Sequence, residues 1–403
     1  MNAGETHVIV GAGQAGAWAG VSLRQAGFAG RILLLGAEPH RPYERPPLSK
    51  SVLTAPEEPA PALFHPHGRY EALGIELRLG VAAVALDPGA RRLLLADGTE
   101  LRWDRLLLAT GGQARRLTVP GGEHALLLRS LEQARAIRAR LAAARQVVCI
   151  GAGVIGLEIA ASARVRGAAV TVLEAAARPM GRSVSAEGAA FVAALHRTQG
   201  VDLRCGVGVA AIEVAADGRA CVTGSDGCAF PADLVVAGVG MERATALAEA
   251  GGIATDNGVL VDALAATATP GVFAAGDAAA FDHPRFGRLR LESWRHAQNH
   301  GIAAGRAMAG VGTAYDDIPW FWTDQFGMNL QVAGLPWLAA TTLVRACTQD
   351  RFVALHLDAE DRPVGLTAAN APREIRAGTA LIRAARPVDP ARASDAAVPL
   401  AAL

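Results

Sequence analysis

One residue of this 403-residue chain differs from all others in its chemistry, because Lys50 is the only lysine. Lysine and arginine together number 39, so the other 38 of these cations are arginines. Arginine presents a planar fork of donors, whereas lysine presents a compact ammonium whose pKa responds to burial. We therefore expect the ammonium at the end of Arg45-Pro-Pro-Leu-Ser-Lys50 to serve chemistry. The alternative is a surface lysine without a role.

A glycine motif near the start of the chain predicts a nucleotide site. It runs as Gly11-Ala-Gly-Gln-Ala-Gly16, between a strand pattern at 6–10 and a helix pattern that stops at Gly27. A second strand pattern at 31–35 leads to Glu38. In a strand–turn–helix unit of this kind, glycines permit the tight turn, the approach of a pyrophosphate and close helix packing, and the acid can accept from ribose hydroxyls. We expect a dinucleotide here, with its phosphates at the helix N-terminus.

The whole unit is repeated at a constant offset of 140 positions, from 11 to 151, from 16 to 156 and from 27 to 167. The second copy has its own strand pattern at 169–173, which ends in Glu174. Asp97-Gly98 and Asp226-Gly227 predict a hairpin turn in each copy. The repeat therefore predicts two nucleotide-binding domains.

The rest of the chain has no second copy. A strand pattern leads to Gly276-Asp277, and the segment from Leu291 continues as a helix pattern to about 309. From Ile318, alternating strand patterns and a helix pattern over 372–385 predict a small antiparallel sheet with one helix. The Ala- and Pro-rich end from about Pro387 is expected to be loosely ordered. The fold class is α/β, with two Rossmann-like dinucleotide-binding domains and a C-terminal α+β domain.

Composition excludes several functions. The formal net charge is +1, which gives no electrostatic reason to expect nucleic acid as a partner. Hydrophobic residues make up 51% of the chain, but no stretch approaches the roughly 20 apolar residues of a membrane helix. No basic segment precedes the apolar pattern at 7–10, so no signal peptide is visible. We expect a cytoplasmic protein that binds neither nucleic acid nor membrane.

The cysteines limit the chemistry further. There are five, none of them in a C-x-x-C pair or at zinc-site spacing: Cys149, Cys205, Cys221, Cys228 and Cys347. Residues 1–148 contain none. We expect no metal site and no cysteine set for an iron–sulfur cluster of the chain's own.

Several segments together resemble one family, the FAD-dependent NADH:ferredoxin reductases. These are the putidaredoxin reductase-like enzymes and the reductase components of three-component aromatic-ring dioxygenases. The resemblance covers essentially the whole chain and rests on the two glycine motifs, Pro42-Tyr-Glu-Arg-Pro-Pro-Leu-Ser-Lys50, Ala109-Thr-Gly111, Gly276-Asp277 and Pro319-Trp-Phe-Trp-Thr-Asp-Gln325. It implies the two-domain arrangement of glutathione reductase, with a discontinuous FAD-binding domain (1–112 and 242–315), an NAD-binding domain (113–241) and a C-terminal α+β interface domain (316–403).

The resemblance also implies the site residues. For FAD they are Gly11, Gly13, Gln14, Ala15, Gly16, Glu38, Arg45, Lys50, Ala83, Ala109, Thr110, Gly111, Arg129, Gly276, Asp277, Ser293, Trp294 and Trp322. For NAD they are Gly151, Gly153, Val154, Ile155, Gly156, Glu158, Glu174, Arg182, Gly238 and Glu292. Ordinary packing is the alternative for the tryptophans. Glu174, followed by three alanines, favours NADH over NADPH, because a carboxylate accepts from ribose hydroxyls and repels a 2′-phosphate.

Two further expectations concern charge. By resemblance, Lys50 and Glu158 form an ion pair beside the flavin and are the catalytic residues; an exposed acid that complements the helix dipole is the alternative for Glu158. Four arginines of the segment after Gly276-Asp277 could steer an acidic ferredoxin, although an Arg-rich solvated surface is equally compatible with the sequence. They are Arg285, Arg288, Arg290 and Arg295.

The predicted function is that of a ferredoxin–NAD(+) reductase. A hydride would pass from NADH to FAD, and single electrons would pass to a [2Fe-2S] ferredoxin that feeds an aromatic-ring dioxygenase or a P450. The alternatives are an NADH oxidase, a rubredoxin reductase and an NADH-responsive flavoprotein similar to apoptosis-inducing factor. The sequence does not specify the ferredoxin, the oxygenase, the organic substrate, the oxygen reactivity or the oligomeric state.

Overall fold

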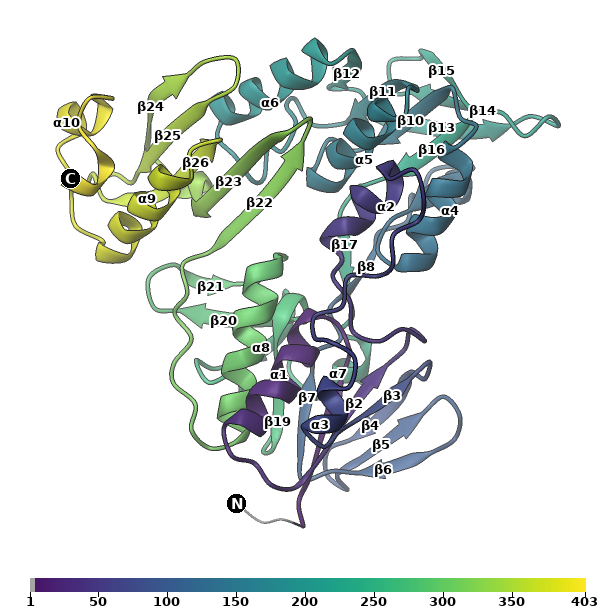
Figure 1. Cartoon of the computed structure of the whole chain (residues 1–403), viewed down its shortest axis with the longest axis vertical. Helices are drawn as coiled ribbons and strands as arrows, with labels where there is room; N and C mark the ends of the chain where they lie inside the picture. Colours follow the sequence, from purple (N-terminus) through teal and green to yellow (C-terminus); the bar gives the residue numbers. More distant parts are fainter. Residues whose placement is uncertain (1–3) are drawn as a thin grey trace. The chain divides into compact units, whose positions relative to one another are not determined.

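The computed structural model of the chain describes residues 4–403, whose packing divides them into two units (Figure 1). Unit 1 consists of the chain up to Glu44, Ala60–Gln113 and Glu242–Asp317. Unit 2 consists of Arg45–Pro59, Ala114–Met241 and Ile318–Leu403. The division by residues that the resemblance implies, into FAD-binding, NAD-binding and C-terminal domains, stays a prediction.

Unit 1 is built on a parallel five-stranded sheet in the order β19-β7-β1-β2-β3. Two smaller sheets, β4-β5-β6 and β18-β20-β21, belong to the same unit. Its strands are β1 (Thr6–Val10), β2 (Arg31–Gly36), β3 (Ile75–Leu79), β4 (Ala83–Asp87), β5 (Arg92–Leu95), β6 (Glu100–Arg102), β7 (Arg105–Leu108), β18 (Val259–Val261), β19 (Val272–Ala274), β20 (Ala279–His283) and β21 (Gly287–Leu289). Its helices are α1 (Gln14–Gln25), α3 (Arg69–Ala72), α7 (Ala246–Ala250) and α8 (Trp294–Met308). Two of the points at which the chain passes from one unit to the other fall in β8 (Gly112–Ala114) and β17 (Met241–Arg243).

Helices α1 and α8 lie side by side in unit 1 (Figure 1). Glycines make this possible, because a Cβ atom at Gly301 would lie 2.2 Å from the carbonyl oxygen of Ala15. A Cβ atom at Gly305 would lie 2.4 Å from that of Ala19. The backbones of the two helices therefore touch directly, and the start of α1 is held against residues far along the chain.

Unit 2 repeats the parallel sheet, in the order β12-β11-β10-β16-β9, with a three-stranded antiparallel sheet β13-β14-β15. Strand β10 and helix α5 lie 140 positions after β1 and α1 at both ends. The strands are β9 (Leu126–Leu127), β10 (Gln146–Ile150), β11 (Ala169–Glu174), β12 (Val201–Cys205), β13 (Val209–Val214), β14 (Ala220–Gly224), β15 (Ala229–Ala232) and β16 (Leu234–Ala237). The helices are α2 (Ser51–Thr54), α4 (Leu131–Leu141), α5 (Val154–Val165) and α6 (Ala186–Thr198). The predicted repeat of a dinucleotide-type domain is confirmed.

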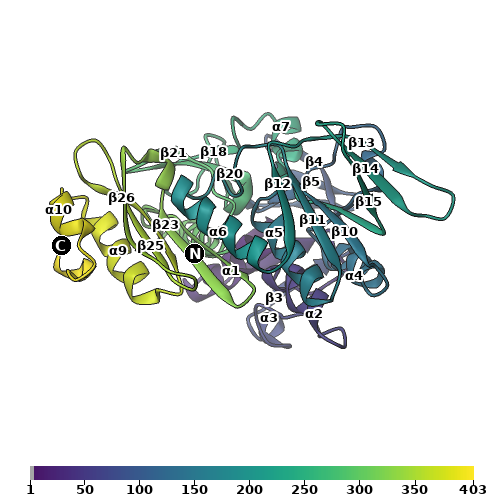
Figure 2. The same ribbon diagram turned by 90° about the horizontal axis from the view of Figure 1, so that it is seen from above.

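The C-terminal part of unit 2 is an antiparallel sheet in the order β22-β23-β26-β25-β24, with α9 beside it (Figure 2). Its elements are β22 (Trp320–Gln325), β23 (Met328–Gly334), β24 (Thr341–Cys347), β25 (Phe352–Leu357), β26 (Pro363–Ala369), α9 (Pro372–Ala384) and α10 (Pro390–Ser394). Helix α6 packs on this sheet, where Phe191 stacks on Phe352 at 5.3 Å between ring centroids. The predicted sheet with one helix is confirmed, and so is the α/β fold class.

The expectation of a loosely ordered end from Pro387 is wrong. Residues 390–394 form α10, and Ala393 and Leu400 are buried. The guanidinium of Arg345 on β24 donates to the carbonyl oxygens of Ala393 and Val398. Composition gave no hint of this, because the partner lies about 50 residues earlier in the chain. Across residues 4–403, the helices are too short or too polar to cross a bilayer, and the cytoplasmic location stays a prediction.

Three fully buried histidines make the fold sensitive to acid. Burial lowers the pKa of His7 and of His356 to about 4, and that of His300 to about 3, because the imidazolium loses its hydration. Between the ordinary pKa near 6.5 and these values, the unfolded chain binds protons that the folded chain rejects. Stability therefore falls as the pH falls through this window, by up to about 1.4 kcal/mol per pH unit for each histidine.

We expect His7→Leu to reduce the loss of stability with falling pH between about pH 7 and pH 5, because leucine cannot bind a proton. A leucine can take the place of the imidazole against the ring of Phe28, on which His7 stacks. The measurement is the urea-unfolding free energy of each protein across that range. The matched control is His67→Leu at an exposed histidine, which should leave the slope of the parent. A His7→Leu protein that loses stability with acid as steeply as the parent would contradict the assignment.

Candidate functional site

The first glycine turn, at the carboxyl end of β1, has the shape that its sequence predicts. Gly11 has a φ of +112°, and a Cβ atom there would lie 2.2 Å from the carbonyl oxygen of Ala109. A Cβ atom at Gly16 would lie 1.9 Å from the carbonyl oxygen of Gly11. At Gly13, by contrast, no heavy atom lies within 4 Å of the position that a Cβ would take. Two glycines are therefore needed by the packing of the protein itself, and the third leaves open space.

That open space lies at the N-terminus of α1. Gly13 is the N-cap and has no side chain to accept from the first-turn N–H groups, and the first turn carries no acid. These N–H groups and the helix dipole favour an anion. The residues present therefore fit the pyrophosphate of a dinucleotide.

Other predicted FAD residues of unit 1 gather around the same turn. A Cβ atom at Gly276 would lie 2.8 Å from the Cβ of Ala15. Gln14 Nε2 donates to Gln298 Oε1 on α8 at 3.1 Å. The segment after Ala109 is held by Ala244, whose N–H donates to the Gly111 carbonyl at 3.0 Å and whose carbonyl accepts from Thr110 Oγ1 at 2.6 Å.

Glu38 follows the second strand of this unit, as a ribose-binding acid should. Its Oε2 accepts from the hydroxyl of Tyr43 at 2.5 Å, which fixes the carboxylate. Its carbonyl accepts from the N–H of Gly80, three residues before Ala83 at the start of β4. The structure thus brings the segments of Glu38 and Ala83 together.

Two predicted FAD residues, Ser293 and Trp294, lie at the start of α8. Ser293 is the N-cap and accepts from the N–H of His296. Trp294 Nε1 donates to the carboxylate of Glu44. Burial raises the pKa of Glu44, and the bond from Trp294 opposes that rise. Sequence reasoning gave Glu44 no role, although it lies inside the Pro42–Lys50 motif.

The second glycine turn repeats the first. Gly151 has a φ of +95°, and a Cβ atom at Gly156 would lie 2.0 Å from the carbonyl oxygen of Gly151. Gly153 is the N-cap of α5, again without a side-chain cap. The atom nearest to a Cβ added at Gly153 would be the carbonyl oxygen of Gly238, at 3.9 Å. A Cβ atom at Gly238 would lie 3.0 Å from the N–H nitrogen of Gly156, so Gly238 flanks this turn. Val154 and the partly exposed Ile155 open α5 at the same place.

Glu174 ends β11 with a fixed carboxylate. Its Oε2 accepts from the N–H of Ala152 at 2.6 Å, and its Oε1 from the N–H of Ala176 at 2.8 Å. Each oxygen keeps a further lone pair for a ribose hydroxyl. The guanidinium of Arg182, another predicted NAD residue, lies near Gly240: its Nη2 would be 3.6 Å from a Cβ atom added at Gly240.

The predicted ion pair of Lys50 with Glu158 is present in unit 2. Lys50 Nζ lies 2.8 Å from Glu158 Oε1, and the side chains are 24% and 3% exposed. Glu158 is therefore not the exposed acid of the alternative interpretation. Its Oε2 also accepts from Ser49 Oγ, and Ser162 Oγ, one turn along α5, donates to the Ser49 carbonyl at 2.6 Å. The motif that ends in Lys50 is thereby joined to α5.

The remaining predicted residues of unit 2 have partners there. Arg45 Nη1 donates to the carbonyl of Arg129, so these two predicted FAD residues meet. Trp322 stacks on Trp320 and donates to Asp324 Oδ2 at 2.9 Å. The predicted residues divide by unit: Arg45, Lys50, Arg129 and Trp322 of the FAD set belong to unit 2 and the others to unit 1, whereas Glu292 of the NAD set belongs to unit 1 and the others to unit 2.

Sequence reasoning missed the residues that hold Glu158. Thr323 Oγ1 donates to Glu158 Oε1 at 2.7 Å, and Gln325 Nε2 donates to Thr323 Oγ1 at 3.0 Å. These are alternate positions of β22, which share a face, whereas Trp322 and Asp324 lie on the other. The alternation in the Trp-Thr-Asp-Gln motif is a signal that could have revealed two faces with two roles.

The four candidate docking arginines differ in their surroundings. Arg288 forms two hydrogen bonds with Asp282 at 3.0 Å and is half exposed. Arg290 is only 13% exposed, pairs with Glu292 at 2.6 Å and donates to the carbonyl of Asp277 at 3.2 Å. Arg290 therefore supports the Gly276-Asp277 turn from within unit 1. Docking at Arg285, Arg288, Arg290 and Arg295 stays a prediction.

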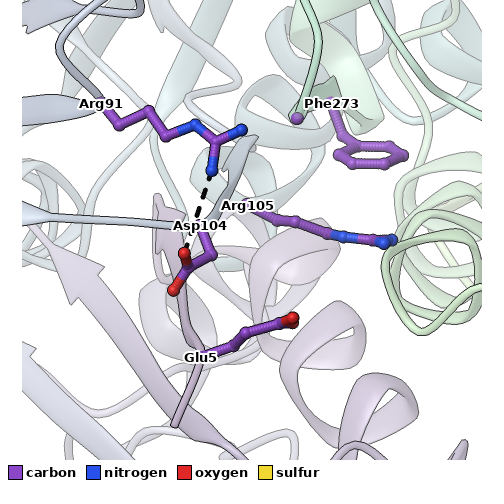
Figure 3. A pocket seen from close by; sticks show the side chains of 6 residues that line it. Glu5, Arg91, Asp104, Arg105 and Phe273 are labelled. Atoms are coloured by element: carbon purple, nitrogen blue, oxygen red, sulfur yellow. Dashed lines mark ion pairs between the residues drawn. The ribbon is translucent and has the colours of Figure 1, made fainter. Parts of the chain in front are cut away.

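One surface hollow of unit 1 lies elsewhere (Figure 3). Glu5, Asp104 and Arg105 line it, at the amino ends of β1 and β7, and Arg91 pairs with Asp104 at 3.9 Å. In open parallel sheets, ligands bind at the carboxyl ends of the strands, where the glycine turns are. This hollow is therefore not at the edge of the sheet where a nucleotide is expected, and the nucleotide site at the glycine turns stays a prediction.

Two dinucleotide-type folds with a C-terminal antiparallel sheet define a class of oxidoreductases, and comparison with known proteins identifies the family. Residues 5–301 match the family described as pyridine nucleotide-disulphide oxidoreductase, and residues 320–403 match the reductase C-terminal domain. The ferredoxin–NAD(+) reductase component of the p-cumate 2,3-dioxygenase system of Pseudomonas putida is 41% identical over 397 residues, 98% of this chain and 97% of that protein.

Two solved structures agree. The ferredoxin reductase for the CYP199A2 system from Rhodopseudomonas palustris has a TM-score of 0.94 and 36% identity, and the alignment covers 98% of each chain. The covalent putidaredoxin reductase–putidaredoxin complex has a TM-score of 0.93 and 35% identity, with 99% of this chain and 98% of that one covered. The chain belongs to the pyridine nucleotide-disulphide oxidoreductase family and, within it, to the ferredoxin–NAD(+) reductases, as the resemblance predicted.

The close approach at the first turn gives a test that needs no cofactor. We expect Gly16→Ala to lower the free energy of unfolding by about 2–3 kcal/mol, because the new methyl would overlap the Gly11 carbonyl oxygen. Gly20→Ala on the same helix is the matched control. There the nearest atom is Ile9 Cδ1 at 3.4 Å, and alanine should add up to about 1 kcal/mol through its helix propensity. Urea unfolding measures both, and equal stability of the two variants would contradict the packing described.

Proposed function

We propose that this chain is an NADH-dependent, FAD-containing reductase that delivers single electrons to a [2Fe-2S] ferredoxin of an oxygenase system. The observation that carries the proposal is the pair of glycine turns, each of which opens a helix without a side-chain cap, leaves at least 3.9 Å around an added Cβ at its middle glycine, and is followed by a fixed carboxylate. A chain with two such turns has a place for two dinucleotides. The near full-length similarity to a ferredoxin–NAD(+) reductase component supports the pairing of a flavin with a nicotinamide.

FAD belongs, in this proposal, to the turn at Gly11–Gly16. The first-turn N–H groups of α1 would hold its pyrophosphate, and Glu38 would accept from the adenosine ribose. Asp277 would orient the ribityl chain, and the backbone around it is supported by Arg290. Bound flavin supplies the chemistry of taking a hydride as two electrons and releasing them one at a time.

The nicotinamide nucleotide belongs to the turn at Gly151–Gly156. Glu174 carries the preference for NADH, because its carboxylate would accept from both ribose hydroxyls and would repel a 2′-phosphate. Alanines at 175–177 offer no cation to a phosphate. We infer that NADPH is the poorer donor.

Lys50 is the catalytic residue of the proposal, with Glu158 as its partner. An ammonium close to the reacting edge of a flavin stabilises negative charge that develops there on reduction. The 2.8 Å ion pair with the buried carboxylate keeps the ammonium at one place. Arginine would carry the same charge on a longer, planar group, and the position has kept lysine in a chain of 38 arginines.

The electron acceptor of the proposal is a separate iron–sulfur protein. The first 148 residues contain no cysteine, so no thiol of that part of the chain can receive electrons. The first cysteine, Cys149, is buried. Cys149 is also a poor nucleophile, because burial raises the pKa of its thiol to about 12. Arg285, Arg288 and Arg295 are proposed to attract an acidic ferredoxin. Arg290 is proposed instead to hold the Gly276-Asp277 turn in place.

One anaerobic experiment tests the proposal. NADH is mixed with the purified flavoprotein in a stopped-flow instrument, and the product is then mixed with a [2Fe-2S] ferredoxin. We expect rapid loss of flavin absorbance with NADH, a slower loss with NADPH, and ferredoxin reduction that slows as salt is added. A long-lived charge-transfer complex without electron release would favour an NADH-responsive signalling protein. Rapid oxidation by oxygen alone would favour an NADH oxidase.

The role of Lys50 makes a separate prediction. We expect Lys50→Arg to lower the rate of flavin reduction by NADH at least about tenfold, which corresponds to 1.4 kcal/mol, although the charge is retained. The affinity for NADH should change little, because the nucleotide contacts lie at the second turn. Stopped-flow absorbance at several NADH concentrations separates the two quantities. Reduction of the flavin at the parent rate in Lys50→Arg would contradict the catalytic role proposed for Lys50.

A further inference from the structure

A chain of buried hydrogen bonds leads away from Glu158 through unit 2. Thr323 Oγ1 contacts Glu158 Oε1 at 2.7 Å, Gln325 Nε2 contacts Thr323 Oγ1 at 3.0 Å, and His196 Nε2 contacts Gln325 Oε1 at 2.7 Å. The exposed fractions of the histidine, threonine and glutamine are 0%, 0% and 1%. These residues come from α6 and β22, whereas Lys50 and Glu158 come from the 45–59 segment and α5.

Chemistry fixes the direction of every bond in this chain. The carboxylate of Glu158 only accepts, so the hydroxyl of Thr323 must donate to it. The hydroxyl oxygen then accepts from the amide nitrogen of Gln325, which leaves the amide oxygen in need of a donor. His196 must supply that donor from Nε2. All donors therefore point toward Glu158, an arrangement in which each bond polarises the next.

The state of His196 follows from its surroundings. With a proton on Nε2, the neutral imidazole carries a lone pair on Nδ1, and Nδ1 has no hydrogen-bond partner among the described residues. A second proton there would be buried without an acceptor. Burial lowers the pKa of His196, and the bond to Gln325 opposes that shift. The ring of Phe326 packs edge-on against the imidazole at 5.1 Å and fixes its plane.

We propose that His196 is a positioning residue for Lys50, acting through Gln325, Thr323 and Glu158. The imidazole selects one orientation of the Gln325 amide, the amide sets the direction of the Thr323 hydroxyl, and the hydroxyl holds one oxygen of Glu158. With Ser49 on the other oxygen, the carboxylate cannot rotate, and the Lys50 ammonium is held at one place. The effect on flavin reduction rests on the function proposed above, whereas the effect on the position of Lys50 does not.

The single lysine allows a direct measurement of that position. Protein grown on lysine labelled with carbon-13 at the ε carbon gives one lysine resonance, which reports on Lys50 alone. We expect His196→Phe, which removes the donor, to move this resonance. His196→Gln, whose amide nitrogen can take the place of Nε2, should leave it close to the parent position. Thr323→Val, a nearly isosteric change in the middle of the chain, should move it as His196→Phe does.

The matched control is His356→Phe. His356 is equally buried and also bonds through Nε2 to a side-chain oxygen, that of Thr367 at 2.9 Å, but its partners do not lead to Glu158. His356→Phe should therefore leave the Lys50 resonance unmoved. If His196→Phe fails to fold, Thr323→Val and His196→Gln still decide the question.

The same variants are tested by stopped-flow reduction with NADH. We expect His196→Phe to lower the rate about fivefold at an unchanged affinity for NADH, as the loss of one hydrogen bond in the network implies. Added to Glu158→Gln, the change should have little further effect, because Glu158→Gln already removes the charged carboxylate through which the network holds Lys50. An unmoved Lys50 resonance in both His196→Phe and Thr323→Val would overturn the proposal. A parent protein that NADH does not reduce would refute the proposed function and leave the resonance test valid.

Discussion

The buried carboxylate of Glu158 is the group on which much of unit 2 depends. It is 3% exposed, and an unpaired charge at such a place costs several kcal/mol. It is satisfied only because Lys50, Ser49 and Thr323 reach it from two other segments of the chain. The need to satisfy one charge therefore joins the 45–59 segment, α5 and β22, and His196 on α6 extends the network. The same contacts place the ammonium of the chain's only lysine.

Close backbone contacts complete the construction. In each glycine turn, the helix begins against the carbonyl oxygen of its own turn, at Gly11 and at Gly151, so no side chain fits at Gly16 or Gly156. In unit 1, Gly301 brings α8 against Ala15 in the first turn of α1. These contacts fix the surrounding backbone, and beside Gly13, at the start of α1, they leave open space. An anion can then bind without a rearrangement of the protein, which lowers the entropic cost of binding.

Much of the fold was predictable because its information is local. A buried strand, a glycine turn and a helix follow each other within some 20 residues, and the 140-residue offset predicted a second copy that the structure contains at β10 and α5. The C-terminal strands were also predictable, from their alternation. The end of the chain was not, because α10 is held by Arg345 from a distant strand, and composition carries no record of that bond.

The sequence by itself determined the duplicated dinucleotide fold, the carboxylates after each second strand and the singular character of Lys50. It also determined, through resemblance, that Lys50 should meet Glu158. Only the tertiary structure decided that Thr323, Gln325 and His196 continue from that pair. The physical reason is that hydrogen bonds between side chains far apart in sequence depend on packing to within a few tenths of an ångström. A threonine, a glutamine and a histidine carry no mark of their partners until the chain is folded.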